Sequence, residues 1–229
     1  MPEFTFTTKD IVTLVGGAPI RTRDLFDCTE ITEFTFAADG GAEHLAEVNV
    51  MPNGVIGDFD SMKEATRLSI PADRLHHVSE QNTTDFEKCI SRITAPLILG
   101  VGFTTGRLDH TLTVFSTLMG FPSQQCLLVN DEEIVFLAPP VLDLDLPLGM
   151  RFSIFPMGHA TGRSTGLEWP IDGLNLSPGG RTGVSNQTSG AVHLEMDHPN
   201  ALVMLPREML DVAIAGLMES DARWPAHGK

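Results

Sequence analysis

The stretch VIGDFDS, residues 55–61, places two carboxylates two positions apart, directly after a short apolar run. Side chains alternate along an extended segment, so Asp58 and Asp60 would point the same way and reach one ion. Carboxylate oxygens without His or Cys partners suit a hard divalent cation such as Mg²⁺. The alternative is a solvated turn, because Asp and Gly are also common turn residues.

The sequence around this stretch indicates an α/β domain. Short apolar runs, each ending in Gly or in polar and acidic residues, alternate with segments of helical spacing. The apolar runs lie at 11–15, 34–38, 54–56, 96–102 and 126–130. This alternation predicts a mostly parallel, Rossmann-like sheet. A helix is expected over 83–93, with Thr84 as its N-cap and Glu87 reaching back to form a capping box. A second is expected over 109–119, with a buried stripe formed by Leu112, Phe115 and Met119.

The rhythm changes after about residue 140. Short apolar runs broken by Gly, Pro and Asn predict antiparallel strands of an all-β sandwich. From about Arg207 the chain is expected to form an amphipathic helix and then a loose tail. We therefore predict an α/β domain over 1–142 and a β-sandwich domain, with a C-terminal tail, over 143–229.

The composition limits the classes of partner. The chain of 229 residues is 42% hydrophobic and has a formal net charge of −15. Such an acidic surface argues against non-specific binding to nucleic acid or to anionic membranes. The three cysteines are far apart, with no CxxC pair, which suits a reducing cytoplasm. No secretory signal and no apolar run of about 18 residues is seen, so a cytoplasmic, soluble protein is expected.

Acidic residues recur where the predicted strands end. They are Asp39, Asp58 and Asp60, Asp85 at a helix start, and Asp109 beyond a fourth strand. Ligands of open α/β sheets bind at the carboxyl ends of the strands. Repulsion among these carboxylates would destabilise the fold unless a cation or ligand offsets it. The pattern predicts a Mg²⁺-dependent site for a phosphate compound.

Arg107 lies two residues before Asp109, in the segment TTGRLDH. Its planar donors are suited to a phosphate, or it forms an ion pair with a neighbouring acid. The chain has neither GxxxxGK[ST] nor GxGxxG, and the pair Gly16-Gly17 alone is a weak signal. Any nucleotide site must therefore be of a less common kind.

Five motifs in order resemble the thiamine pyrophosphokinase family. They are ADGGAEHL (38–45), GDFDSM (57–62), QNTTDFEKCI (81–90), GRLDHTL (106–112) and GVSNQ (183–187). The resemblance implies an α/β catalytic domain, a C-terminal β-sandwich and a homodimer with sites between the subunits. It also implies the reaction of ATP with thiamine to give AMP and thiamine diphosphate, with Mg²⁺ and with ATP as co-substrate.

The resemblance also implies residue roles. The residues implied to bind the nucleotide and the metal are Asp39, Asp58, Asp60, Asp85, Arg107 and Asp109. Among them, Asp58, Asp60 and Asp85 are the implied metal ligands. Thr84 would lie beside them as a helix cap or a phosphate contact. Gln81, Ser185 and Asn186 look like thiamine-side residues, with groups suited to an aminopyrimidine edge. Otherwise Gln81 is a polar loop residue, and the Ser-Asn pair a turn between strands.

The chain departs from the family pattern at two places. Thr105 replaces the first Gly of Gly-Gly-Arg, and Gln187 stands where an acid often follows Ser-Asn. With no Tyr in the chain, Trp169 is one candidate to stack on thiamine, although a place in the sandwich core is the alternative.

In the expected mechanism, the thiamine hydroxyl attacks the β-phosphorus of ATP. Asp60 or Asp85 would orient or deprotonate that hydroxyl, with His110 as another possible base or a surface residue. Arg107 and Asp109 complete the expected catalytic set. Two alternatives remain open: a pyrophosphokinase for a pterin alcohol, and a non-catalytic sensor of nucleotides or thiamine compounds.

Overall fold

The computed structural model describes residues 4–226 as two compact units. The first unit holds the chain up to Thr117 together with Leu128–Asp131, and the second holds Leu118–Leu127 and the chain from Glu132 onward. This division falls earlier than the predicted boundary between residues 142 and 143. The strands at 133–137 and 141–144 pair within the second unit, which explains the difference.

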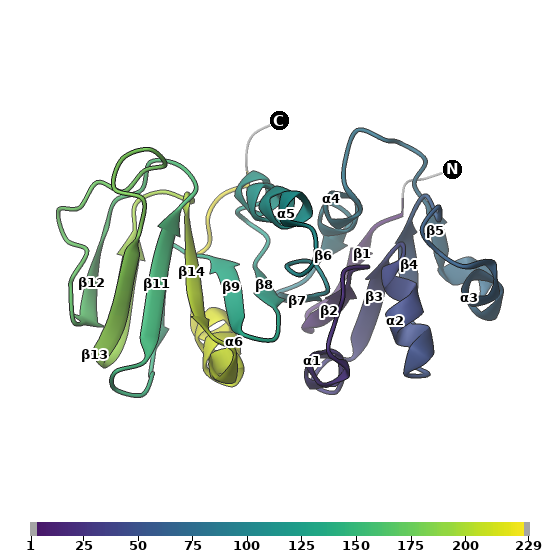
Figure 1. Cartoon of the computed structure of the whole chain (residues 1–229), viewed down its shortest axis with the longest axis horizontal. Helices are drawn as coiled ribbons and strands as arrows, with labels where there is room; N and C mark the ends of the chain where they lie inside the picture. Colours follow the sequence, from purple (N-terminus) through teal and green to yellow (C-terminus); the bar gives the residue numbers. More distant parts are fainter. Residues whose placement is uncertain (1–3, 227–229) are drawn as a thin grey trace. The chain divides into compact units, whose positions relative to one another are not determined.

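The first unit is built on a parallel sheet with the strand order β7-β2-β3-β4-β5 (Figure 1). The strands are β2 (Val12–Val15), β3 (Phe34–Ala38), β4 (Gly54–Gly57), β5 (Leu75–His77) and β7 (Ile98–Val101). Beside β7 lies β8 (Cys126–Val129), whose last two residues belong to this unit. β1 (Phe6–Thr7) and β6 (Ile93–Thr94) form a separate parallel pair. The predicted apolar runs thus contain strands, and β2, β4, β7 and β8 are buried throughout.

The order of these strands creates a switch point. The chain runs from β2 outward to β5 and then returns to β7 on the other side of β2. Neighbouring connections therefore leave the sheet in opposite directions at the carboxyl ends of β2 and β7. In open α/β sheets such a point forms a crevice in which ligands bind.

Five helices connect these strands. They are α1 (Thr22–Thr29), α2 (Gly41–Glu47), α3 (Glu64–Ser69), α4 (Asp85–Ile90) and α5 (Leu108–Gly120), and a 3-10 turn, η1 (Ala72–Arg74), precedes β5. Thr84 is the N-cap of α4, as predicted, and its hydroxyl accepts the Glu87 backbone N–H at 3.3 Å. The helix is shorter than the expected 83–93, because the chain extends into β6 at Ile93.

The buried face of α5 differs from the prediction. Leu112 is 53% exposed, and Phe115 and Met119 are only half-buried. The buried positions are Val114, Thr117 and Leu118. Both sets fit helical spacing, so periodicity alone does not reveal which face packs.

The second unit is antiparallel and mostly β. Its strands are β9 (Glu133–Leu137), β10 (Val141–Leu144), β11 (Arg151–Pro156), β12 (Gly162–Leu167), β13 (Val184–Met196) and β14 (Ala201–Pro206). The long strand β13 pairs with β11 through its first residues and with β10 and β12 through its last ones. β14 joins β11 to β9. One long strand is therefore shared by two sets of partners.

The unit is not all-β, because η2 (Arg207–Met209) and α6 (Leu210–Glu219) follow β14. A Cβ atom at Gly216 would lie 2.5 Å from Cδ2 of Leu144, so α6 packs closely on β10. The helix expected after Arg207 is thus confirmed. None of the helices among residues 4–226 is long and apolar enough to cross a membrane.

Candidate functional site

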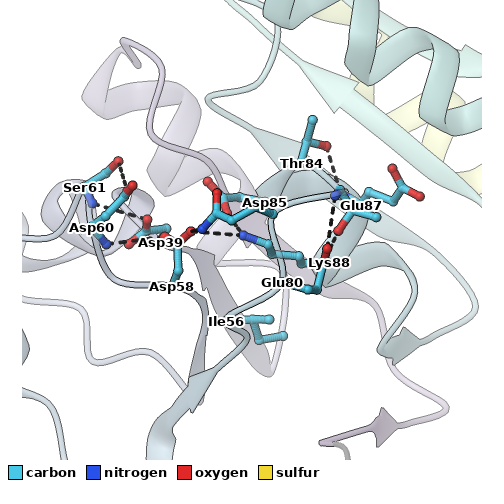
Figure 2. A network of polar contacts seen from close by, with 12 residues as sticks. Asp39, Ile56, Asp58, Asp60, Ser61, Glu80, Thr84, Asp85, Glu87 and Lys88 are labelled. Carbon is cyan, nitrogen blue, oxygen red and sulfur yellow. Dashed lines mark hydrogen bonds and ion pairs between the residues drawn. The ribbon is translucent and has the colours of Figure 1, made fainter.

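Three carboxylates meet at the carboxyl ends of β3 and β4. Asp39 follows β3, while Asp58 and Asp60 follow β4, and one oxygen of each lies within 4.8 Å of the others. We call these residues the aspartate cluster (Figure 2). The prediction that acids separated in sequence converge in space is confirmed for these three.

The backbone that brings the cluster together is unusual. Asp39 has φ 39° and Phe59 has φ 66°, both in the left-handed region that side chains other than Gly rarely adopt. Asp58 and Asp60 therefore converge because the chain turns at Phe59, rather than by alternation along an extended strand. A Cβ at Gly57 would lie 2.8 Å from the Cβ of Asp39, so only Gly fits there. Such backbone conformations concentrate at functional sites.

Asp39 is the buried member of the cluster, with 1% of its surface exposed. Its Oδ2 accepts the Ser61 backbone N–H at 3.3 Å, but its Oδ1 is buried with no hydrogen-bond partner among the described residues. Burial, together with the neighbouring carboxylates, raises the pKa of Asp39 to about 7. A buried oxygen without a partner is costly, so this one needs a proton or a cation.

Asp58 differs from Asp39. Burial acts to raise its pKa, but hydrogen bonds and a cation outweigh burial and lower the pKa to about 2. Its Oδ2 accepts from Gln81 at 2.6 Å and from Lys88 at 3.4 Å, and its Oδ1 accepts the Asp60 N–H at 3.4 Å. One carboxylate of the cluster is thus held ionised while its neighbour tends to hold a proton.

Lys88 supplies that cation. The side chain is only 3% exposed, and its Nζ lies 3.1 Å from Asp85 Oδ1 and 3.4 Å from Asp58 Oδ2. Figure 2 shows the ammonium directed between these two carboxylates. No role for Lys88 was predicted from the sequence, although its place three residues after Asp85 on one helix face was a usable signal.

Lys88→Met should destabilise the protein by about 3 kcal/mol, because it leaves partly buried carboxylates without their cation. Urea unfolding at pH 7.5 measures the effect. The double variant Lys88→Met/Asp58→Asn should recover much of this loss, since it removes the unpaired charge as well. Equal loss in the single and double variants would contradict the assignment of Lys88 as the counter-ion.

The cluster fits a divalent cation. Its donors are all carboxylate oxygens, which Mg²⁺ prefers, and Asp39, one of its members, also has a buried oxygen without a hydrogen-bond partner. Asp85, an expected metal ligand, is not part of the group that lies within 4.8 Å. Its side chain is 41% exposed and pairs with Lys88. The structure thus groups Asp39 with Asp58 and Asp60, whereas the sequence had placed Asp85 there.

Arg107 and Asp109 lie at the start of α5, and both are exposed. Arg107 Nη2 donates to Asp109 Oδ2 at 2.6 Å and Nε donates to Oδ1 at 3.1 Å. The ion pair raises the pKa of Arg107 and lowers that of Asp109. This is the ion-pair alternative of the sequence analysis. His110, next to them, is also exposed.

The expected thiamine-side residues fall into two kinds. Gln81 is exposed and donates to the aspartate cluster through Asp58. Ser185 and Asn186 lie within β13, so the alternative of a turn between strands is wrong. Ser185 is exposed, whereas Asn186 is buried.

The buried side chain of Asn186 holds the backbone of Trp169. Its Oδ1 accepts the Trp169 N–H at 3.1 Å and its Nδ2 donates to the Trp169 carbonyl at 2.6 Å. Trp169 as a residue is 57% exposed, so the alternative that placed it in the sandwich core is wrong. The chain thus presents a large aromatic ring at the surface from a fixed backbone.

Residues 27–129 match the family model of the thiamin pyrophosphokinase catalytic domain. This confirms the resemblance that the four motifs between residues 38 and 112 indicated; the fifth motif, GVSNQ (183–187), lies outside the matched segment. The matched segment contains the aspartate cluster, Lys88, Arg107 and Asp109.

Curated relatives carry the same family name. Thiamine pyrophosphokinase 1 of Oryza sativa is 29% identical over 154 residues, which cover 59% of this chain and 58% of the relative. Thiamin pyrophosphokinase 1 of Caenorhabditis elegans is 25% identical over 177 residues, which cover 69% of this chain and 72% of the relative. The match to the rice relative thus spans under two thirds of its length.

Solved structures share the fold. The thiamin pyrophosphokinase of Geobacillus thermodenitrificans aligns with a TM-score of 0.69 and 22% identity, covering 86% of this chain and 96% of that one. The yeast thiamin pyrophosphokinase aligns with a TM-score of 0.71 and 17% sequence identity, and the alignment covers 94% of this chain and 90% of the yeast chain.

Proposed function

We propose that this protein is a Mg²⁺-dependent thiamine pyrophosphokinase of the cytoplasm. It transfers the diphosphate group of ATP to the hydroxyethyl group of thiamine, giving thiamine diphosphate and AMP. The observation that carries the proposal is the aspartate cluster, with its unpartnered Asp39 oxygen, inside the segment that matches the catalytic-domain family.

In this proposal, Asp39, Asp58 and Asp60 hold the magnesium ion. Bound Mg²⁺ supplies charge neutralisation for the phosphate oxygens during transfer. Asp85 contributes by holding Lys88, whose charge acts together with the hydrogen bond from Gln81 to keep Asp58 ionised and ready to act as a ligand. Asp60, the exposed member, is the better candidate to orient the attacking hydroxyl, because Asp85 is bound to Lys88.

Arg107 is proposed as a phosphate clamp. Its guanidinium is 69% exposed and bound only at the surface to Asp109, so exchanging the carboxylate for a phosphate costs little desolvation. Asp109 then keeps the guanidinium positioned until the nucleotide arrives. Thr84 stays the cap of α4 in this proposal.

The thiamine side is assigned to Gln81, Ser185 and the exposed ring of Trp169. An indole stacks on aromatic rings and attracts cations, and thiamine offers both an aromatic pyrimidine and a cationic thiazolium. Asn186 acts through the Trp169 backbone. We further propose a homodimer with thiamine sites between the subunits, in which the first unit binds ATP and the second unit contributes to the thiamine site.

Gln81→Ala should raise KM for thiamine about tenfold, the value of one lost hydrogen bond, and change KM for ATP less than twofold. Steady-state kinetics with each substrate varied in turn measures the two constants. Asn82→Ala, in the same loop, is the matched control. Equal rises in both constants would show that Gln81 does not serve thiamine.

One incubation tests the proposed function. The purified protein, given ATP, Mg²⁺ and thiamine, should release AMP and form thiamine diphosphate, and chelation of the metal should stop both. A preference for hydroxymethylpterin as acceptor would indicate the pterin-alcohol alternative. Binding of ATP without release of AMP would indicate a sensor.

A further inference from the structure

The loop that carries Gln81 is fixed at both of its ends. It joins β5 to α4 over residues 78–84. At its start, the Val78 N–H donates to the Gly57 carbonyl at 2.8 Å, which continues the pairing of β5 with β4. At its end, Thr84 caps α4. Gln81 lies between these two anchors, so its position depends on how the middle of the loop is held.

The half-buried carboxylate of Glu80 holds the middle of this loop. Its Oε2 accepts the backbone N–H of Asn82 at 2.8 Å and that of Thr83 at 3.2 Å, and its Oε1 accepts the Thr83 hydroxyl. These hydrogen bonds, chiefly the one from the hydroxyl, lower the pKa of Glu80. An ionised carboxylate can accept all three bonds at once. One side chain thus ties down both residues that follow Gln81.

The side chain of Gln81 is oriented by Asp58. Its Nε2 donates to Asp58 Oδ2 at 2.6 Å. Because an ionised carboxylate only accepts hydrogen bonds, the amide turns its NH₂ group toward Asp58 and its carbonyl oxygen away. The contact therefore decides which end of Gln81 a substrate meets. That end is a hydrogen-bond acceptor, which suits an amino group.

This single hydrogen bond is too weak to order the loop by itself. Its net gain is comparable with the entropy that is lost when one residue's backbone and a glutamine side chain are fixed. It leaves no surplus to order the residues on either side. The contact between Gln81 and Asp58 can therefore be well populated only where other bonds already hold the loop. Glu80 supplies three such bonds.

We propose that Glu80 is a positioning residue for thiamine: its carboxylate orders the loop, so that Gln81 stays on Asp58 and presents its carbonyl oxygen to the substrate. The inference rests on the proposed function, since it concerns the thiamine side of that site. In this assignment Glu80 acts through Gln81 and does not touch thiamine. It lies just before the motif QNTTDFEKCI (81–90), so the motif did not include it.

A double-mutant cycle tests whether Glu80 acts through Gln81. Glu80→Ala should raise KM for thiamine about tenfold, as Gln81→Ala should, and change KM for ATP less than about twofold. In the double variant Glu80→Ala/Gln81→Ala, KM for thiamine should stay within about threefold of either single variant, because both changes remove the same interaction. A rise of about a hundredfold, the product of two independent effects, would overturn the inference.

Two further variants separate the carboxylate from its charge. In Glu80→Asp the shorter carboxylate can still accept the N–H two residues further on, as Asp does in turns, so KM for thiamine should stay within about threefold of the wild type. Glu47→Ala removes an exposed carboxylate from α2 in the same unit and is the matched control. Its constants should equal those of the wild type. A KM for thiamine raised as much by Glu47→Ala as by Glu80→Ala would overturn the inference.

Nuclear magnetic resonance tests the positioning without any substrate. The order parameter of Gln81 Nε2 should fall below about 0.6 in Glu80→Ala and stay above it in the wild type and in Glu47→Ala. An unchanged order parameter in Glu80→Ala would overturn the inference, even for an enzyme that makes thiamine diphosphate. A wild type that forms no thiamine diphosphate, but whose Gln81 loses its order in Glu80→Ala, supports the positioning by Glu80 and contradicts the proposed function alone.

Discussion

Asp60→Asn should lower turnover of thiamine to thiamine diphosphate by about 100-fold or more, because it removes one charged ligand of the proposed magnesium site. The fold should be unaffected. Asp60 is exposed, and an amide oxygen can still accept the Ser61 hydroxyl that the carboxylate accepts at 2.9 Å. Measuring the rate against magnesium concentration gives a second readout, since the variant should need more Mg²⁺ to reach its own maximum.

Asp73→Asn is the matched control, since it removes an equally exposed carboxylate from η1 in the same unit. Its turnover and magnesium requirement should equal those of the wild type. A rate within threefold of the wild type for Asp60→Asn, at limiting magnesium, would reject Asp60 as a metal ligand.

Asp39 should make the metal-free protein less stable as the pH rises from about 4 to 7. Its pKa is about 7 in the folded protein, against an ordinary 3.8, so the folded state holds the extra proton in this window. Stability then falls with pH wherever the folded state binds more protons than the unfolded state. The loss attributable to this group is about 4 kcal/mol, at 1.36 kcal/mol for each pKa unit.

Asp39→Asn should remove this slope. Urea unfolding in EDTA, from pH 4 to pH 8, gives the difference between variant and wild type, which should grow by about 4 kcal/mol in favour of the variant. Adding Mg²⁺ at pH 8 should stabilise the wild type more than the variant. His193 also has a raised pKa, caused chiefly by Asp143, but its stabilisation is lost only above its ordinary 6.5. Parallel curves for the two proteins would contradict the role of Asp39.

The sequence predicted what depends on local patterns. The strands lie within the predicted apolar runs, Thr84 is the N-cap of its helix, and acidic residues lie at the strand ends. Each of these features depends on residues that are close together in the sequence. Prediction from local patterns failed where two apolar stripes fit the same helix and only tertiary packing determines which of them is buried. On α5 both Leu112 and Val114 belong to plausible stripes, and only the fold buries the second.

The site shows the same division. Asp58 and Asp60 were recognised from their spacing, but their convergence depends on the left-handed turn at Phe59, which no propensity favours. The spacing of Lys88 from Asp85 was a local signal, but its contact with Asp58, 30 residues away in a different element, could not be predicted from neighbouring residues. Trp169 was assigned to the core as an alternative, yet a buried amide 17 residues later fixes its backbone at the surface.

The buried ammonium of Lys88 has a consequence for the electrostatics of a bound metal. Because this internal cation already balances part of the negative charge of Asp58 and Asp85, a divalent ion at the aspartate cluster would meet less net negative charge than the number of carboxylates suggests.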